Sequence, residues 1–121
     1  MSEIITILPI ELTNRNDGRG YSWHRTAAEK KRIQKALANM PREPFSVPVR
    51  ITVTRILGKG QRLWDYDSGL RGNWKEIQDT LVNLGWFHDD SPKWIKGIVF
   101  EQDDTNKANG PAIELKIRTA A

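Results

Sequence analysis

Six charged side chains between positions 65 and 90 have types and spacings suited to phosphodiester hydrolysis. They form an acidic pair two positions apart, a lysine and an acid four positions apart, and an adjacent acidic pair: Asp65, Asp67, Lys75, Asp79, Asp89 and Asp90. Hydrolysis requires an activated water, neutralised phosphoryl charge and a stabilised leaving oxygen, all of which two divalent ions can supply. Mg²⁺ prefers oxygen ligands, usually carboxylates, waters and phosphate oxygens. The stretch therefore predicts a Mg²⁺ site, in which Mn²⁺ could be a substitute.

The elements around this stretch decide whether the carboxylates can meet. At the spacing of a strand, Asp65 and Asp67 present both side chains on one face. A helical apolar pattern follows over residues 70–84, and an acid at 89–90 would return to the site from its far end. Lys75 would lie about two turns inside that helix. There it could hold the scissile phosphate or steady the attacking hydroxide.

Each part of this pattern also has a simpler interpretation. An Asp-x-Asp pair is common in proteins that bind no metal. Lys75 and Asp79 can form a surface ion pair worth a few tenths of a kcal/mol. The acids at 89–90, before Ser91 and Pro92, can belong to a turn. The combination, in this order and on a basic chain, favours the metal site.

Hydrophobic periodicity predicts the elements that carry these residues. In chain order they are strand 4–10, helix 26–40, strand 47–57, helix 70–84, strand 96–102 and strand 112–118. Thr26 and Glu29 have the capping-box spacing, Gly85 supplies a helix stop, and residues 103–111 resemble a hairpin loop. The order β-α-β-α-β-β predicts an α+β fold, with one small domain over 1–121 and two helices packed on a mixed sheet.

Composition excludes several classes of protein. The 121 residues include no cysteine and only two histidines, which excludes disulfides, thiolate zinc sites and all-histidine metal sites. No apolar run is long enough for a membrane span, and no signal peptide is apparent. We therefore expect a cytoplasmic protein with no membrane partner and no small-molecule cofactor.

Positive charge is concentrated before position 76. Residues 14–75 carry 14 Lys and Arg against five Asp and Glu, whereas residues 76–121 carry five against eight. This asymmetry suits a polyanion held against a metal site. The candidate DNA-binding residues lie in a glycine-containing loop, immediately before and along the predicted first helix, and before Lys75: Arg15, Arg19, Arg25, Lys30, Lys31, Lys35 and Arg71. The alternative is a mobile loop and a solvated basic helix face without a partner.

With these motifs in place, the chain resembles the RusA family of Holliday-junction resolvases, especially its phage and prophage-borne members. The family pattern of Asp-x-Asp, Lys-x-x-x-Asp-x-Leu and a glycine followed by apolar residues and Asp-Asp matches DYD at 65–67, KEIQDTL at 75–81 and GWFHDD at 85–90. The flanks also resemble the family, in its opening strand, basic first helix and closing strand pair: 8–16, 22–37, 98–102 and 112–117.

The resemblance implies a small Mg²⁺-dependent homodimeric endonuclease that binds four-way DNA junctions and nicks two strands symmetrically. By motif position, it implies that Asp65, Asp67 and Asp90 bind the metal, that Asp89 supports them, and that Lys75 is the catalytic lysine. A homodimer also needs an interface, and aromatic residues are enriched at interfaces. The interface candidates, each with core packing as its alternative, are Trp64, Trp86, Phe87 and Trp94.

The chain departs from the family pattern at two positions. Ser68 stands where the family usually has Asn, and Gly69 adds a residue before Lys75. Both could displace the lysine, in which case Arg71 becomes the candidate for its role. Asp79 would be a further supporting residue. The competing interpretations are a nuclease acting on flaps or forks, a non-catalytic DNA-junction-binding protein, and a phage structural protein with incidental acids.

Overall fold

The computed structural model describes residues 3–13, 23–38, 45–65, 70 and 72–120, except for the side chains of residues 23–26. Its elements are β1 (Glu3–Leu8), α1 (Trp23–Ala38), β2 (Val49–Ile56), α2 (Trp74–Asn83), β3 (Ile95–Asp103), the short 3-10 helix η2 (Lys107–Asn109) and β4 (Ala112–Thr119). The α+β class and the order β-α-β-α-β-β are confirmed. No helix in this part of the chain combines the length and apolar character needed to span a membrane.

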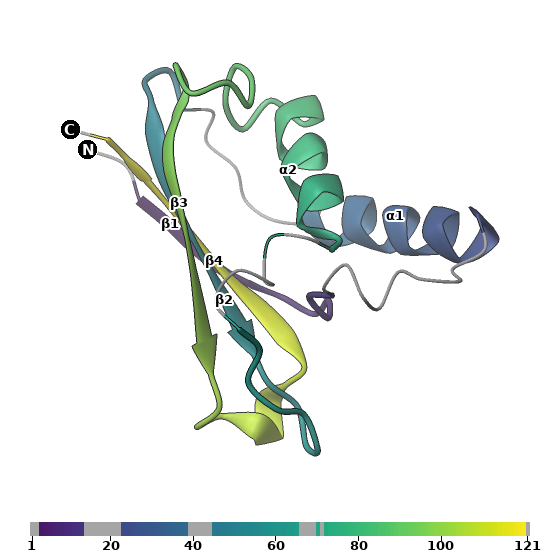
Figure 1. The fold of residues 1–121 in the computed structure, drawn as a ribbon. Helices are drawn as coiled ribbons and strands as arrows, with labels where there is room; N and C mark the ends of the chain where they lie inside the picture. Colours follow the sequence, from purple (N-terminus) through teal and green to yellow (C-terminus); the bar gives the residue numbers. More distant parts are fainter. Residues whose placement is uncertain (1–2, 14–22, 39–44, 66–69, 71, 121) are drawn as a thin grey trace.

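The described strands form one mixed sheet in the order β1-β4-β2-β3 (Figure 1). β4 pairs antiparallel with both β1 and β2, whereas β2 pairs in parallel with β3. Parallel neighbours require a crossover connection, and α2 lies within the connection between β2 and β3. The last strand in the sequence therefore lies inside the sheet, between two strands that precede it.

The hairpin predicted over residues 103–111 is wrong. β3 and β4 do not pair, because β2 lies between them, and their connection contains η2. Burial explains the arrangement. The inward positions of β2 and β4 are buried along almost their whole length, whereas β3 is fully buried only at Ile95. The two strands with the more apolar inner faces take the centre of the sheet, and β3 takes an edge.

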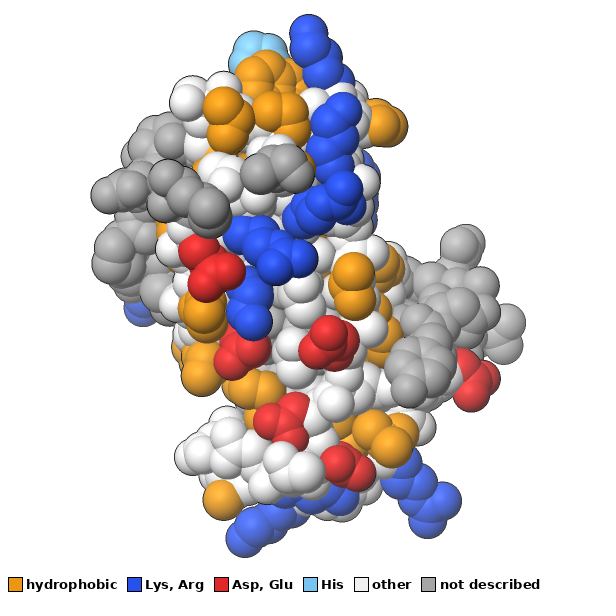
Figure 2. Space-filling model, turned by 90° about the vertical axis from the view of Figure 1, so that its left-hand side faces the viewer, with side chains coloured by type: hydrophobic (Ala, Val, Ile, Leu, Met, Phe, Trp, Pro, Cys, Tyr) orange, Lys and Arg blue, Asp and Glu red, His pale blue; other side chains and the backbone are white. Residues whose placement is uncertain are grey.

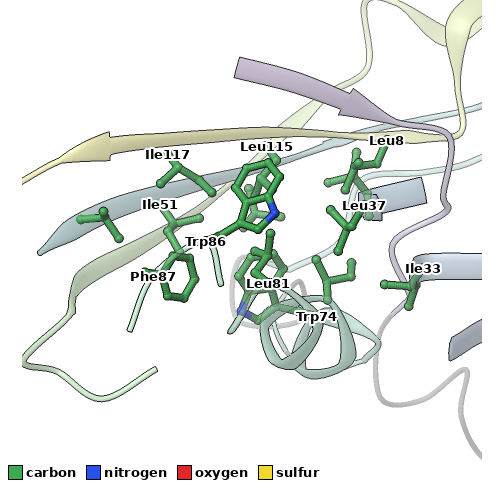
Figure 3. Close-up of a cluster of buried hydrophobic side chains, with 14 of the residues drawn as sticks. Leu8, Ile33, Leu37, Ile51, Trp74, Leu81, Trp86, Phe87, Leu115 and Ile117 are labelled. Atoms are coloured by element: carbon green, nitrogen blue, oxygen red, sulfur yellow. The ribbon is translucent and has the colours of Figure 1, made fainter. Parts of the chain in front are cut away.

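Both helices cover one face of the sheet (Figure 1). The core lies between that face and the helices and contains side chains from every main element and from the loop after α2 (Figure 3). Strand residues reach it at every second position, as expected from the alternation of side chains. Ile51, Leu115 and Ile117 enter from the sheet, opposite Leu37 of α1 and Leu81 of α2, and each is at most 1% exposed.

Both helices begin at different residues from those predicted. α1 begins at Trp23, so the capping-box spacing at 26–29 lies inside it. α2 begins at Trp74. Leu70 packs against the core from the preceding segment and thereby extends the apolar pattern one turn beyond the helix. Lys75 is therefore the second residue of α2, in its first turn, and not two turns inside.

The helix stop at Gly85 is confirmed. Gly85 has a φ of 81°, in the left-handed region that glycine adopts most easily. Its N–H donates to the Val82 carbonyl at 2.9 Å, and the Trp86 N–H donates to the Leu81 carbonyl at 3.0 Å. This pair of bonds is the Schellman arrangement, in which the residue after the glycine usually packs back onto the helix. Trp86 accordingly lies in the core, fully buried with Leu81.

Candidate functional site

Asn73 fixes the start of α2 to an N-terminal segment. The residue is 7% exposed. Its Oδ1 accepts from the Thr13 N–H at 2.9 Å, its Nδ2 donates to the Glu11 carbonyl at 2.9 Å, and its own N–H donates to Thr13 Oγ1 at 3.1 Å. A Cβ at Gly72 would overlap the Thr13 carbonyl oxygen. Two segments far apart in sequence thus meet at Gly72, a point that only glycine allows, three residues before Lys75.

Lys75 lies between two carboxylates at the surface. Its Nζ is 3.0 Å from Asp90 Oδ2 and 3.1 Å from Asp79 Oδ1. The same Asp90 oxygen accepts from Gln78 Nε2 at 3.2 Å. The Lys75 side chain is 66% exposed and that of Asp90 is 38% exposed. The structure therefore brings together two of the predicted site residues, Lys75 and Asp90, where a ligand from solution can reach them.

These contacts shift the pKa values of both partners. Hydrogen bonds to Asp90 and then to Asp79 raise the pKa of Lys75 above its ordinary value. The hydrogen bonds from Lys75 and then Gln78 lower the pKa of Asp90. Near neutral pH Lys75 is thus a cation and Asp90 an anion. Lys75 can donate to an anionic ligand, but it cannot serve as a general base without first losing a firmly held proton.

The two adjacent acids have different surroundings. Asp89 Oδ1 accepts from the backbone N–H of Ser91 at 2.8 Å, and hydrogen bonding to Ser91 lowers the pKa of Asp89. This bond stabilises the turn in which the Ser91 carbonyl accepts from Trp94 and Ile95, at the start of β3. Asp90, in contrast, faces Lys75. The structure favours Asp90 as the site carboxylate and gives Asp89 a role in the turn that presents it.

A hollow beside the pair connects it to α1. It has a volume of about 380 Å³. Its lining comes from α1, from the exposed side of α2 and from the loop before β3: Lys30, Glu76, Asp79, Thr80, Val82, Asn83 and Asp90. One of the predicted DNA-binding residues, Lys30, therefore lies at the candidate site. Lys31 and Lys35 are exposed on α1, and no described contact brings them to Lys75.

Asp65 directly follows Trp64, whose backbone is hydrogen-bonded to the side chain of Gln102 in β3. The Trp64 N–H donates to Gln102 Oε1 at 2.8 Å, and Gln102 Nε2 donates to the Trp64 carbonyl at 2.9 Å. The Arg55 guanidinium lies 3.6 Å from the centroid of the Trp64 ring and donates to the Arg62 carbonyl at 2.8 Å. Asp65 is exposed. These contacts fix the chain immediately before the predicted acidic pair.

Sequence reasoning missed three of these supporting residues. Gln78 lies three positions after Lys75, and a spacing of three brings helical side chains onto one face. Arg55 continues the alternation of buried positions in β2 and is 3% exposed. Gln102 is its register partner in β3. The alternation of Val49, Ile51 and Val53 places Arg55 at an inward position of the strand. A charged residue at such a position requires partners, and the sequence could therefore have indicated a structural role for Arg55.

Several predicted site residues lie outside the described part of the chain: Asp67, Arg71, Arg15 and Arg19, together with Ser68 and Gly69. Arg25 lies in α1, but its side chain is not described. Within the described ranges, no group of three Asp, Glu, His or Cys side chains is arranged to hold a metal ion. The carboxylate chemistry fits a hard cation, and the predicted set also requires Asp67.

No protein-family model matches the chain, and no curated protein matches it. The geometry around Lys75 and the motifs in the sequence are therefore the observations that bear on function.

Proposed function

We propose that the chain is a Mg²⁺-dependent, structure-selective DNA endonuclease that resolves four-way junctions by paired symmetric nicks in recombination and repair. The proposal follows the resemblance to the RusA family. It includes a homodimer, because one Asp65–Asp67–Asp90 set cannot make two matched cuts from one bound orientation. It also places the protein in the bacterial cytoplasm, encoded by a phage or prophage.

The observation that carries the proposal is the exposed contact between Lys75 and Asp90. A lysine at position 75 contributes little to the stability of the fold. A cation in the first turn of a helix is disfavoured by the helix dipole, and a basic residue four positions before an acid is the weaker orientation of a helical ion pair. An exposed pair contributes about 0–1 kcal/mol. A lysine kept charged at the surface beside a carboxylate supports a role toward an external anion.

The charged residues have separate roles in the proposed reaction. Lys75, protonated beside its two carboxylates, donates to a non-bridging oxygen of the scissile phosphate. Asp90, ionised at neutral pH, would hold Mg²⁺ together with Asp65 and Asp67. When bound, the ion supplies a water of lowered pKa and neutralises phosphoryl charge. Asp89 keeps the turn that presents Asp90.

The basic face of α1 supplies the proposed grip on DNA. Lys30 lines the hollow beside Asp90, and Lys31 and Lys35 are exposed on the same helix. Phosphate contacts made by such residues fix the register of a duplex without reading its sequence. A junction arm that follows α1 would bring its backbone to Lys75.

Incubation of purified protein with labelled junction, fork, flap and duplex DNA, in Mg²⁺ or in EDTA, tests the proposal. We expect paired nicks in the junction in Mg²⁺ and none in EDTA. Asp67→Asn and Asp90→Asn should abolish cleavage and leave junction binding intact, because an amide is a poorer ligand for a hard cation. The matched control is Asp104→Asn, an exposed acid in the loop after β3, which should cut normally.

The outcomes separate the alternatives. Junction binding without cleavage under any metal condition would identify a non-catalytic junction-binding protein. Equal cutting of flaps, forks and junctions would identify a broader nuclease. Full activity in EDTA, or in the purified Asp67→Asn variant, would overturn the metal assignment.

A further inference from the structure

Gln78 links the buried ring of Trp74 to Asp90. The Trp74 Nε1–H donates to Gln78 Oε1 at 3.0 Å, and Gln78 Nε2 donates to Asp90 Oδ2 at 3.2 Å. Trp74 is 3% exposed and lies in the core (Figure 3), whereas the Asp90 side chain is 38% exposed. Gln78 is half-buried between them. One chain of hydrogen bonds therefore runs from the core to the exposed carboxylate.

The orientation of the Gln78 amide follows from the chemistry of Trp74. An indole N–H is a donor only, whereas a glutamine amide has one accepting oxygen and an NH₂ group that donates. The oxygen of Gln78 must therefore face Trp74, and the NH₂ group faces Asp90. Trp74 and Gln78 are four positions apart in α2, so the helix itself brings the ring to the amide. The buried ring thus fixes which end of the amide Asp90 receives.

Lys75 and Gln78 hold the same oxygen of Asp90 in different ways. Both donate to Oδ2, Lys75 at 3.0 Å and Gln78 at 3.2 Å. Lys75 is 66% exposed, has a flexible stem and also contacts Asp79. Gln78 is neutral, and its amide is fixed by the core. When an anionic ligand draws Lys75 away, Gln78 is the described side chain that continues to donate to Asp90.

Stability alone does not require a glutamine at position 78. A glutamate there would also accept from Trp74, and it would lie three positions from Lys75, at the spacing of a helical ion pair. It would, however, offer Asp90 no donor and would place a second negative charge beside it. A glutamine satisfies Trp74 and Asp90 at once. The residue type therefore fits the task of orienting the carboxylate.

We propose that Gln78 is a positioning residue for Asp90. It holds Oδ2 in the direction set by Trp74, so that the carboxylate keeps one orientation while Lys75 exchanges partners. The part of this role that concerns cleavage rests on the proposed nuclease, in which Asp90 would hold Mg²⁺ and Lys75 would contact the scissile phosphate. Groups that orient a metal ligand by hydrogen bonding typically contribute about 10–100-fold to metal affinity or activity.

The indole N–H signal of Trp74 in a ¹H–¹⁵N correlation spectrum tests the link without DNA or metal. The chain has five tryptophans, and Trp74→Phe identifies the signal as the one that disappears. Asp90→Ala should shift this signal in the wild-type background, because the NH₂ group of Gln78 loses its acceptor. The same substitution should cause no shift in the Gln78→Ala background, where the link is absent.

Glu101 supplies the control for the loss of a carboxylate. Figure 2 shows the sheet face that α1 and α2 leave uncovered, with acidic side chains toward one end. Glu101 is exposed and follows Phe100, which packs against the core, so alternation places Glu101 on the uncovered face. Glu101→Ala should leave the Trp74 signal unchanged. A Trp74 signal that is indifferent to Asp90→Ala, or that shifts equally in the Gln78→Ala background, would overturn the link.

Single-turnover cleavage of junction DNA in Mg²⁺ tests the positioning role. Gln78→Glu keeps the acceptor for Trp74 and should therefore fold as the wild type does, yet its cleavage rate should fall about 10–100-fold. Gln78→Ala should lose rate to a similar extent and retain its affinity for the junction, because Gln78 contacts no phosphate in this role. Asn83→Asp is the matched control. It makes the same change from amide to acid at an exposed position near the end of α2 and should cut normally.

The two measurements separate the failure of this inference from that of the nuclease. If the wild type cuts junctions and both Gln78 variants cut at its rate, the positioning role is overturned and the nuclease stands. If the wild type cuts no DNA, the nuclease is overturned, and the Trp74 signal still decides whether Gln78 orients Asp90. A Gln78→Ala variant that loses junction affinity together with rate would also overturn the role, since it would identify Gln78 as a DNA contact.

Discussion

Replacement of Asn73 by alanine should destabilise the protein by about 2–4 kcal/mol. The substitution removes two hydrogen bonds to backbone groups, those with the Thr13 N–H and the Glu11 carbonyl. Leaving a buried backbone group unpaired costs about 1–3 kcal/mol. Because these contacts are only partly buried, water can reach the exposed groups to some extent, and the lower part of the range applies to each. The expected total is therefore about 2–4 kcal/mol.

Equilibrium unfolding in urea, followed by tryptophan fluorescence, measures this change. Trp74 and Trp86 are buried at 3% and 0% exposure, so their emission should report on loss of the core. Asn83→Ala is the matched control, because Asn83 is exposed near the end of the same helix and should change stability by less than about 0.5 kcal/mol. The loss of stability in Asn73→Asp should lie between those of Asn73→Ala and Asn83→Ala. The aspartate keeps the oxygen that accepts from the Thr13 N–H but loses the N–H that donates to the Glu11 carbonyl. An Asn73→Ala variant as stable as Asn83→Ala would refute the anchoring role.

Four further predictions concern the site and the fold. Lys75→Ala should lower junction cleavage at least about 10²-fold with binding retained, and a normal rate in single-turnover assays would refute its role. DNA affinity should fall with salt by about 0.9 log unit per phosphate contact per log unit of salt, and a flat profile in fluorescence anisotropy would contradict the basic-face model. Gly85→Ala should cost about 1 kcal/mol, because the positive φ alone opposes a side chain and no atom lies within 4 Å; urea midpoints measure it. Because Lys75 lowers the pKa of Asp90, the stability that this group contributes should be present above the ordinary carboxylate pKa of about 3.9. It should be lost as the pH falls through the lower folded value, and Asp90→Asn should flatten this acid limb of a plot of unfolding midpoint against pH.

Local sequence patterns predicted the helices and strands. They did not predict the order of the strands in the sheet, which depends on contacts between residues far apart in the sequence. The alternation of Val49, Ile51 and Val53 identifies a half-buried strand, and the left-handed requirement at Gly85 identifies a helix end. Neither pattern states which strand lies beside which. The order β1-β4-β2-β3 depends on how apolar the inner face of each whole strand is compared with the others. Local patterns do not contain that comparison, and they therefore predict a hairpin between β3 and β4 that does not form. Leu70 made the predicted start of the second helix too early. It packs against the core from the segment before α2, and its apolar side chain therefore continues the helical pattern outside the helix.

The candidate site likewise combines one contact that local spacing predicts and one that depends on the path of the chain. The approach of Lys75 to Asp79 follows from helical spacing and could be predicted. The approach of Lys75 to Asp90 depends on the path of the chain through the Schellman turn and the Asp89–Ser91 turn, which spacing alone does not specify. The predicted interface residues Trp86 and Phe87 were wrong, because they are 0% and 2% exposed. The same turn that presents Asp90 places their rings in the core.

The central position of β4 has a consequence for the order of folding. β1 pairs with β4 from Glu3 with Arg118 to Leu8 with Ile113, across more than a hundred residues of intervening chain. Closing so long a loop costs entropy before any pairing rewards it, and contacts of this kind slow folding. During synthesis, β2, α2 and β3 can assemble while β1 still lacks its neighbour in the sheet. The apolar side chains of Ile5 and Ile7 then remain on an unpaired strand, where association between nascent chains begins. β1 is thus among the last of these strands to find its partner, although it precedes the other three in the sequence.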